Sequence, residues 1–189
     1  NGFVANVSKD EAIKAASAAY MPEGKVTIPF SPMIVNTGSK LVAIDTGNGL
    51  GAFAGSKGVV GQARGNMEAA GIHPAKIDIV LISHFHGDHI GGLKNADGSP
   101  AFPNAEIKVP AAEQAFWSDE ANASKANGFN KAQFPNVKKM MEGLKVTTYE
   151  PNKEVAPGST AIATPGQTPG RTSCVMARGA EKDGGPTDG

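Results

Sequence analysis

The segment from Ile77 to His89 constrains the fold more than any other part of this chain. Its first part, Ile77 to Ile82, has the length and the β-branched content of a buried strand. The strand runs directly into the loop 83–89, whose sequence is SHFHGDH. A chain with this segment must bury a sheet and also hold a cluster of polar side chains at the end of one strand.

Metal-binding side chains occupy four of the six positions from His84 to His89. Residues two apart in an extended chain project to the same side, so His84 and His86 can reach one cation. Gly87 allows the chain to turn, which lets Asp88 and His89 point into the same cavity. Two metals about 3.5–4 Å apart would fit four such ligands. Imidazole with carboxylate favours zinc and leaves iron, manganese or cobalt open.

A lone histidine more often caps a strand or lines a polar surface than binds a metal. Here three of the four histidines lie in one loop, and this clustering favours a metal site. The fourth, His73, precedes a proline on the turn before the strand. We therefore predict that His73 is a surface turn residue.

The rest of the chain has a mixed pattern of helices and strands, with no internal repeat. A capping pattern starts the first helix at Ser8, and the segment 51–58 is predicted as a glycine-rich loop. One domain is predicted over 1–178, followed by a disordered tail at 179–189. The expected helices are 8–21, 59–70, 110–121 and 137–144, and the expected strands are 25–30, 33–36, 40–45, 77–82, 106–109, 145–149, 160–164 and 172–178.

Charge and composition disfavour several classes of partner. Lysine plus arginine and aspartate plus glutamate both count 18, and no basic run is present, which disfavours nucleic acid and an RNA-processing nuclease. The longest apolar stretches fall far short of the roughly 20 residues that span a bilayer. The single cysteine, Cys174, cannot form an internal disulfide and is predicted to be a small buried residue, so the compartment stays open.

The pattern His-x-His-x-Asp-His after a buried strand resembles the signature of the metallo-β-lactamase superfamily. The similarity extends to Asn36–Val42 leading into Ile44–Gly47, to Ala101–Ala105 and to Thr164–Thr172, which occur in the order of that family. Among its branches, the chain is most similar to the methyl parathion hydrolases and related lactonases.

This resemblance implies an α/β fold, the αββα sandwich of that superfamily. It also implies that His84 and His86 bind a first zinc ion, while Asp88 and His89 bind a second. Asp45 would lie beneath the site and support the loop without binding metal. The alternative for Asp45 is a simple turn cap before Gly47.

The chain departs from the family pattern after residue 164. Gln167 stands where the family has a third histidine for the first metal, and Arg171 replaces a nearby histidine. An amide is a poorer zinc ligand than imidazole, and a guanidinium repels a cation. A bridging aspartate and a last histidine are also expected later in the family, so the sandwich is predicted to be incomplete in its C-terminal half. Such a half would expose an apolar sheet face, which association, for example as a homodimer, would cover.

The implied function is a metal-dependent hydrolase acting on a small ester-like molecule, such as a lactone or a phosphotriester. A metal-activated hydroxide would attack the substrate, and Asp88 would hold this hydroxide as well as a metal. Aromatic side chains, chiefly Phe85 and Trp117 and also Phe116 and Phe129, are candidates for an apolar pocket wall. The alternative function is a catalytically impaired remnant that binds one metal or a partner chain, which the residues at 167 and 171 favour.

Overall fold

The computed structural model describes residues 6–22, 28–126 and 128–176, and the chain divides into two units, 1–30 and 31–189. The first unit carries helix α1 (Lys9–Ala18). The hydroxyl oxygen of Ser8 accepts a hydrogen bond from the Glu11 amide at 3.3 Å, and the Glu11 carboxylate accepts one from the Ser8 amide at 2.9 Å. This reciprocal capping confirms the predicted start of the helix, which ends at Ala18 and not at residue 21.

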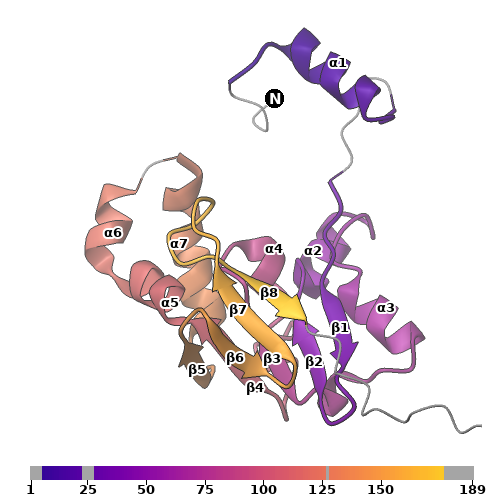
Figure 1. The fold of residues 1–189 in the computed structure, drawn as a ribbon, viewed down its shortest axis with the longest axis vertical. Coiled ribbons are helices and arrows are strands. Elements are labelled where there is room, and N and C mark those ends of the chain that lie inside the picture. Colours follow the sequence, from indigo (N-terminus) through magenta and orange to yellow (C-terminus); the bar gives the residue numbers. More distant parts are fainter. Residues whose placement is uncertain (1–5, 23–27, 127, 177–189) are drawn as a thin grey trace, which may run out of the picture. The chain divides into compact units, whose positions relative to one another are not determined.

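Five strands form the larger sheet, in the order β1-β2-β3-β4-β5 (Figure 1). The edge strand β1 is antiparallel to β2, and the other neighbours are parallel. The carboxyl ends of β2 to β5 therefore meet at one edge of the sheet. The strands are β1 (Met33–Asn36), β2 (Leu41–Ile44), β3 (Ile79–Leu81), β4 (Glu106–Pro110) and β5 (Val146–Tyr149).

A second, antiparallel sheet has three strands in the order β6-β7-β8. They are β6 (Lys153–Ala156), β7 (Ser159–Ala163) and β8 (Thr172–Met176). The sequence did not predict β6, because its exposed half carries Lys153 and Glu154 and only its last two residues are buried. A short strand of this kind is defined by its pairing with β7 and not by an alternating pattern.

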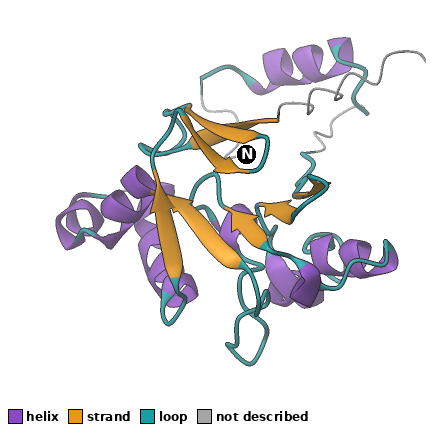
Figure 2. Ribbon diagram, turned by 60° about the horizontal axis from the view of Figure 1, so that its bottom comes forward, coloured by secondary structure: helices purple, strands orange, loops and turns teal. Residues whose placement is uncertain are grey.

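Helices cover the side of the five-stranded sheet that faces away from the three-stranded sheet (Figure 2). No helix in the described part of the chain is long and apolar enough to cross a membrane. The helices of the second unit are α2 (Gly49–Gly55), α3 (Ala63–Ala69), the 3-10 turn Pro74–Lys76, α4 (Gly87–Ile90), α5 (Ala111–Ser118), α6 (Glu120–Lys125) and α7 (Gly128–Met141).

Several predicted boundaries were wrong. The segment 51–58 was expected to be a loop, but most of it belongs to α2, where alanine, leucine and phenylalanine alternate with the glycines. The predicted helix 110–121 is split at Asp119, whose carboxylate accepts a hydrogen bond from the Ala121 amide at 2.8 Å and caps α6. Helix α7 begins at Gly128 and not at 137, and it contains Pro135.

Packing explains why α7 tolerates an internal proline. Phe134 and Val137 on either side of Pro135 are buried in the core, and this burial outweighs the hydrogen bond that proline removes. Three predictions lie wholly or partly outside the described residues. They are the tail 179–189, the last two residues of the strand 172–178, and the strand 25–30, of which residues 28–30 are described and are not in a strand. The single domain 1–178 stays a prediction.

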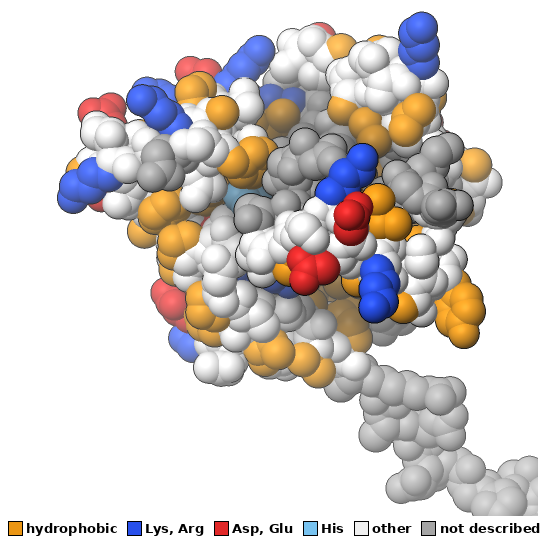
Figure 3. All heavy atoms as spheres, turned by 90° about the horizontal axis from the view of Figure 1, so that it is seen from above, with side chains coloured by type: hydrophobic (Ala, Val, Ile, Leu, Met, Phe, Trp, Pro, Cys, Tyr) orange, Lys and Arg blue, Asp and Glu red, His pale blue; other side chains and the backbone are white. Residues whose placement is uncertain are grey.

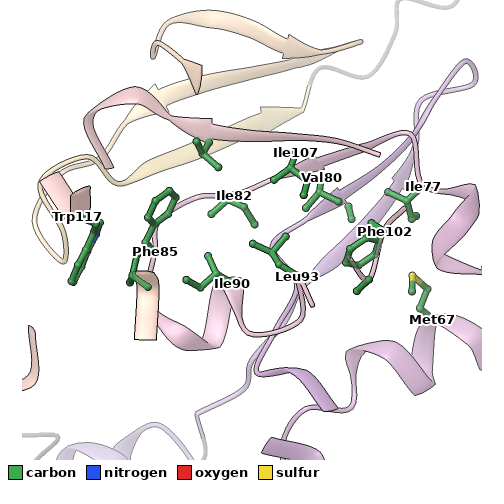
Figure 4. Packing of buried hydrophobic residues seen from close by; sticks show 14 of the residues in the cluster. Met67, Ile77, Val80, Ile82, Phe85, Ile90, Leu93, Phe102, Ile107 and Trp117 are labelled. Atoms are coloured by element: carbon green, nitrogen blue, oxygen red, sulfur yellow. The ribbon is translucent and has the colours of Figure 1, made fainter. Parts of the chain in front are cut away.

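Two apolar clusters hold the second unit together. The larger lies between the five-stranded sheet and the helices and includes Val80, Ile82, Phe85 and Leu93 (Figure 4). The smaller lies between the two sheets and includes Val42, Leu81, Val155 and Ala161. Because β3 contributes to both clusters, it is buried on both faces, as its apolar sequence predicted.

Tyr149 connects the end of β5 to the segment that precedes the histidine loop. Its buried hydroxyl donates a hydrogen bond to the Ile82 carbonyl at 2.8 Å and lies 2.7 Å from the Thr172 hydroxyl on β8. Burial raises the pKa of the Tyr149 hydroxyl. One side chain thus joins both sheets at the edge where the carboxyl ends of the parallel strands meet.

Replacement of Tyr149 with phenylalanine should lower the free energy of unfolding by about 1–3 kcal/mol, because it leaves a buried carbonyl and a buried hydroxyl without this partner. Urea unfolding followed by circular dichroism measures the change. Tyr20→Phe is the matched control, since the only other tyrosine is 98% exposed and should unfold at the wild-type midpoint. Equal midpoints for both variants would contradict the structural role of Tyr149.

Candidate metal centre

The histidine loop lies at the edge where the parallel strands end. Asp45 follows β2, and Ser83 and His84 follow β3. In open sheets with parallel strands, ligands bind outside the carboxyl ends of the strands. The topology therefore brings the side chains of Asp45 and the loop 83–89 together, although they are about forty residues apart in sequence.

His84 and His86 are almost completely buried, with 1% and 4% of their surface exposed. Their ring centroids are 4.8 Å apart, and those of His84 and His89 are 3.9 Å apart. The Nε2 atoms of His84 and His86 are both buried without a hydrogen-bond partner. A buried ring nitrogen normally has a partner, so these two atoms are free to serve as ligands.

Asp88 and His89 lie on the short helix α4, which starts directly after His86. His89 places Nδ1 2.7 Å from the Asp45 carboxylate and Nε2 3.3 Å from the Asp88 carboxylate. Thr46 holds the helix from the other side, because its hydroxyl donates to the His89 carbonyl at 2.8 Å. The turn expected at Gly87 is therefore the first turn of a helix, and it brings both side chains toward the preceding strand.

The Asp45 carboxylate accepts several hydrogen bonds from the loop 83–89. Its carboxylate accepts hydrogen bonds from the Ser83 amide and the Ser83 hydroxyl, both at 2.8 Å, and contacts His89. Its backbone has φ +57°, a left-handed conformation that aspartate adopts more readily than most residues. These contacts reach the loop itself, so they favour a supporting role for Asp45 over a simple turn cap.

The ring pKa is lowered in two of the three loop histidines and raised in the third. Burial, followed by the neighbouring His89 and His86, lowers the pKa of His84 to about 3, and burial also lowers the pKa of His86. Burial alone would lower the pKa of His89 as well, but hydrogen bonds with Asp45 and Asp88 outweigh it and raise this pKa to about 9. The hydrogen bond from His89 in turn lowers the pKa of Asp88.

The donor chemistry of the loop fits a divalent metal such as zinc. Two neutral imidazoles present unpartnered buried nitrogens, and a carboxylate and a third imidazole lie beside them. Among the residues described, no three histidine, cysteine, aspartate or glutamate side chains are already arranged to hold an ion. Both ring nitrogens of His89 contact carboxylates, Nδ1 with Asp45 and Nε2 with Asp88.

Gln167 contacts His86 in the candidate centre. Its side-chain amide nitrogen lies 3.2 Å from His86 Nδ1, on the opposite side of the ring from the unpartnered Nε2. Arg171 is half-buried on the same turn, and its carbonyl accepts a hydrogen bond from the Thr164 amide at 2.9 Å. The turn 164–172 therefore approaches His86 through a neutral amide.

The aromatic residues expected to line a pocket differ in exposure. Phe85 is only 2% exposed and packs in the larger core cluster, which favours a core role over a pocket wall. Trp117 is also buried, with its ring 6.0 Å from that of His86. Phe129 is 64% exposed, and its ring lies 5.2 Å from that of His86. Figure 3 shows a histidine side chain recessed among hydrophobic and uncharged side chains.

Outside the loop, His73 lies on an exposed turn, as the sequence predicted, whereas Cys174 was predicted to be buried and is only half-buried. His73 is exposed and its Nδ1 accepts a hydrogen bond from the Ala75 amide at 3.2 Å, capping a turn. Cys174 is half-buried in β8, and burial raises the pKa of its thiol to about 11. A thiol of this kind is a poor nucleophile at neutral pH.

One buried acidic residue, Glu113, was missed by the sequence analysis. It lies on α5 and accepts hydrogen bonds from the histidine loop, from Trp117 and from the turn 164–172. The only sequence signal was its spacing of four residues from Trp117, which places the two side chains on one face of a helix. Its other two partners are distant in sequence, so only the tertiary structure identifies them.

Comparison with protein families identifies the class of this chain. Residues 31–182 match the model of the metallo-beta-lactamase superfamily, so the chain belongs to this superfamily. No curated protein gave a significant match. The matched range lies within the second unit and includes every residue of the candidate centre.

Solved structures with the same fold agree with this assignment. The hydrolase AbOPH of the beta lactamase superfamily superimposes with a TM-score of 0.78 at 27% identity, over 93% of this chain and 62% of its own. AidC, a dizinc quorum-quenching lactonase in complex with a product, gives 0.77 at 24% identity, over 92% and 61%. A quorum-quenching N-acyl homoserine lactone lactonase gives 0.58 at 24% identity, over 84% and 60%. The chain thus spans about three fifths of the length of these structures.

Replacement of Asp45 with asparagine should lower the pKa of His89 by at least about one unit from its value near 9, because it removes the charge that stabilises the imidazolium. Titration of the ring resonances by NMR in metal-free protein measures this pKa. Asp78→Asn is the matched control: Asp78 also accepts a backbone hydrogen bond, from Leu41 at 2.8 Å, but it lies away from the loop. An unchanged His89 titration in the Asp45 variant would contradict the proposed electrostatic link.

Proposed function

We propose that this chain is part of a metal-dependent hydrolase whose metal ligands are His84, His86, Asp88 and His89. The observation that carries the proposal is the pair of buried, unpartnered Nε2 atoms on His84 and His86. Leaving two such atoms unsatisfied would be costly unless a further group contacts them, and a neutral imidazole nitrogen can donate its lone pair to a metal cation. Membership of the superfamily and the similarity to a dizinc lactonase support zinc as this cation.

Three of the four proposed ligands have the ionisation that metal binding requires, whereas His89, whose pKa is raised to about 9, must release a proton to bind a metal. The lowered pKa values keep His84 and His86 neutral near pH 7, which leaves a lone pair available on each ring. The lowered pKa of Asp88 keeps its side chain a carboxylate. When bound, a divalent metal supplies Lewis acidity and lowers the pKa of water toward neutrality. Asp88, the carboxylate beside the three imidazoles, is the residue we assign to hold the nucleophilic water.

In this chain Gln167 is assigned as a hydrogen-bond partner of His86, and its side chain lies beside the proposed ligands. Its amide faces Nδ1, while the free nitrogen of the same ring is Nε2. With its amide oxygen toward the ring, Gln167 would accept from Nδ1–H and leave the Nε2 lone pair free. Asp45 is likewise assigned as the hydrogen-bond partner of His89 Nδ1, which its carboxylate contacts at 2.7 Å.

The substrate we propose is a small ester-like molecule with an apolar group, such as a lactone or a phosphotriester. The exposed ring of Phe129 lies beside His86, so it would contact such a group next to the metal ligands, whereas Trp117, also beside His86, is buried in the larger core cluster. The structural similarity to the hydrolase AbOPH and to AidC, bound to an N-acyl homoserine product, supports the branch that contains methyl parathion hydrolases and lactonases.

A second candidate function is a catalytically impaired remnant that binds one metal or a partner chain. The observation that favours it is the use of both His89 nitrogens by carboxylates, which leaves only His84 and His86 free. The two candidates differ in metal content and turnover. About two metals per chain with hydrolysis of esters or lactones favours the hydrolase, whereas about one metal or fewer without turnover favours the remnant.

Replacement of His84 with alanine should abolish most zinc binding, because it removes the most deeply buried free imidazole. Elemental analysis after dialysis against zinc measures the content, which we expect to fall by more than half. His73→Ala is the matched control, since this histidine caps a surface turn and should leave zinc content unchanged. If the wild-type protein retains no zinc, the proposed function is wrong.

Replacement of Gln167 with histidine should tighten zinc binding by roughly tenfold, because an imidazole is a better zinc ligand than an amide. Competition with a chelating dye measures the affinity. Gln62→His adds a histidine at an exposed position away from the loop and serves as the control. Equal affinity in the wild type and the Gln167 variant would show that a side chain at position 167 does not reach the metal.

A further inference from the structure

Glu113 is a fully buried carboxylate that the proposed chemistry does not use. Its exposed fraction is 0%, although it lies in the first turn of a helix whose other end carries exposed residues. Burying a carboxylate is costly unless it is paired or hydrogen-bonded. Within residues 28–126 and 128–176, no ion pair involves Glu113. Its burial therefore depends on neutral hydrogen-bond donors.

Three N–H groups from three different segments donate to this carboxylate. The Phe85 amide and the Trp117 indole donate to Oε2 at 3.0 and 2.8 Å, and the Gly170 amide donates to Oε1 at 2.8 Å. All three partners are donors, which matches the acceptor-only character of a carboxylate. An apolar residue of the same size would leave these donors buried without a partner.

The three donors surround His86. Phe85 lies between His84 and His86, so its amide sets the course of the main chain that carries both rings. Trp117 has its ring 6.0 Å from that of His86. Gly170 belongs to the turn that brings Gln167 to His86 Nδ1. Glu113 is thus the shared partner of the segments that contact His86 from different directions.

Close packing at Gly170 shows how tightly this turn is held against α5. A Cβ at position 170 would lie 2.6 Å from the Ala112 carbonyl carbon and 2.9 Å from the Ala112 side chain. The turn approaches the start of α5 through backbone atoms, and only glycine leaves room for this. The hydrogen bond to Glu113 fixes the turn at that point of approach.

We propose that Glu113 is a positioning residue for the candidate metal centre. It holds the backbone of the histidine loop, the Trp117 indole and the turn that carries Gln167 in one arrangement, and so it orients His86 from both sides. Glu113 itself touches neither metal nor substrate. The inference rests on the proposed metal-binding function and extends it to a residue outside the ligand set.

The conservative variant Glu113→Gln tests this role. Its amide keeps the shape of the side chain but has one acceptor oxygen, so at least one of the three donors must face an NH2 group. The least disruptive orientation keeps the oxygen toward Phe85 and Trp117 and loses the bond from Gly170. We therefore expect the turn that carries Gln167 to loosen first.

The experiment measures zinc affinity and amide hydrogen exchange in the wild-type chain, in Glu113→Gln and in the control Glu106→Gln. Glu106 is a surface glutamate on β4, paired with Lys108 at 3.6 Å, and its replacement should change neither quantity. For Glu113→Gln we expect zinc affinity to fall by about tenfold and exchange at the Gly170 amide to accelerate, with a native circular dichroism spectrum. Trp117 is the only tryptophan in the sequence, so tryptophan fluorescence reports separately on the surroundings of the indole that donates to Glu113.

The outcomes separate the two proposals. Wild-type zinc affinity in a folded Glu113→Gln protein overturns the role of Glu113 and leaves the metal centre standing. Failure of the wild type to bind zinc overturns the metal centre and, with it, the positioning role. If Glu113→Gln does not fold, hydrogen exchange in the wild type tests the proposal instead. Zinc should then slow exchange at the Gly170 amide and at the Phe85 amide together. Slower exchange at Phe85 alone would overturn the proposal.

Discussion

The hydrogen bonds of the Asp45 carboxylate are the interaction on which the rest of the site depends. They join the end of β2 to Ser83 at the end of β3 and to His89 on α4. Without this acceptor, the loop would leave a buried amide and a ring nitrogen without partners. The left-handed backbone of Asp45 turns the carboxylate toward the loop, so a local strain at one residue positions the whole cluster.

The three histidines share one loop, but their ring pKa values differ because their surroundings differ. His84 and His86 are enclosed by the sheet and the helices, and loss of solvent favours their neutral form. His89 is held between two carboxylates, and their hydrogen bonds favour its charged form despite burial. Glu113 complements this arrangement from the opposite side, because it binds main-chain amides and leaves the imidazole nitrogens free.

The accuracy of the sequence predictions followed the strength of the local signal. Strand β3 and the capped start of α1 were predicted correctly, because an apolar run and a capping box are determined within a few residues. Helix α2, strand β6 and the start of α7 were missed. In these segments glycines, charged residues or a proline contradict the final structure, and contacts distant in sequence decide it.

The sequence by itself determined the residue types of the candidate ligands and their order, because a histidine-rich loop after an apolar strand is encoded in neighbouring residues. Only the tertiary structure decided how those side chains are oriented and which groups support them. Asp45, Glu113 and Gln167 reach the loop from other parts of the chain, and Tyr149 reaches Ile82 just before it. These contacts depend on strand order and on packing between layers. Such contacts leave no periodic pattern in a single sequence, because each partner is set by the fold and not by its neighbours along the chain.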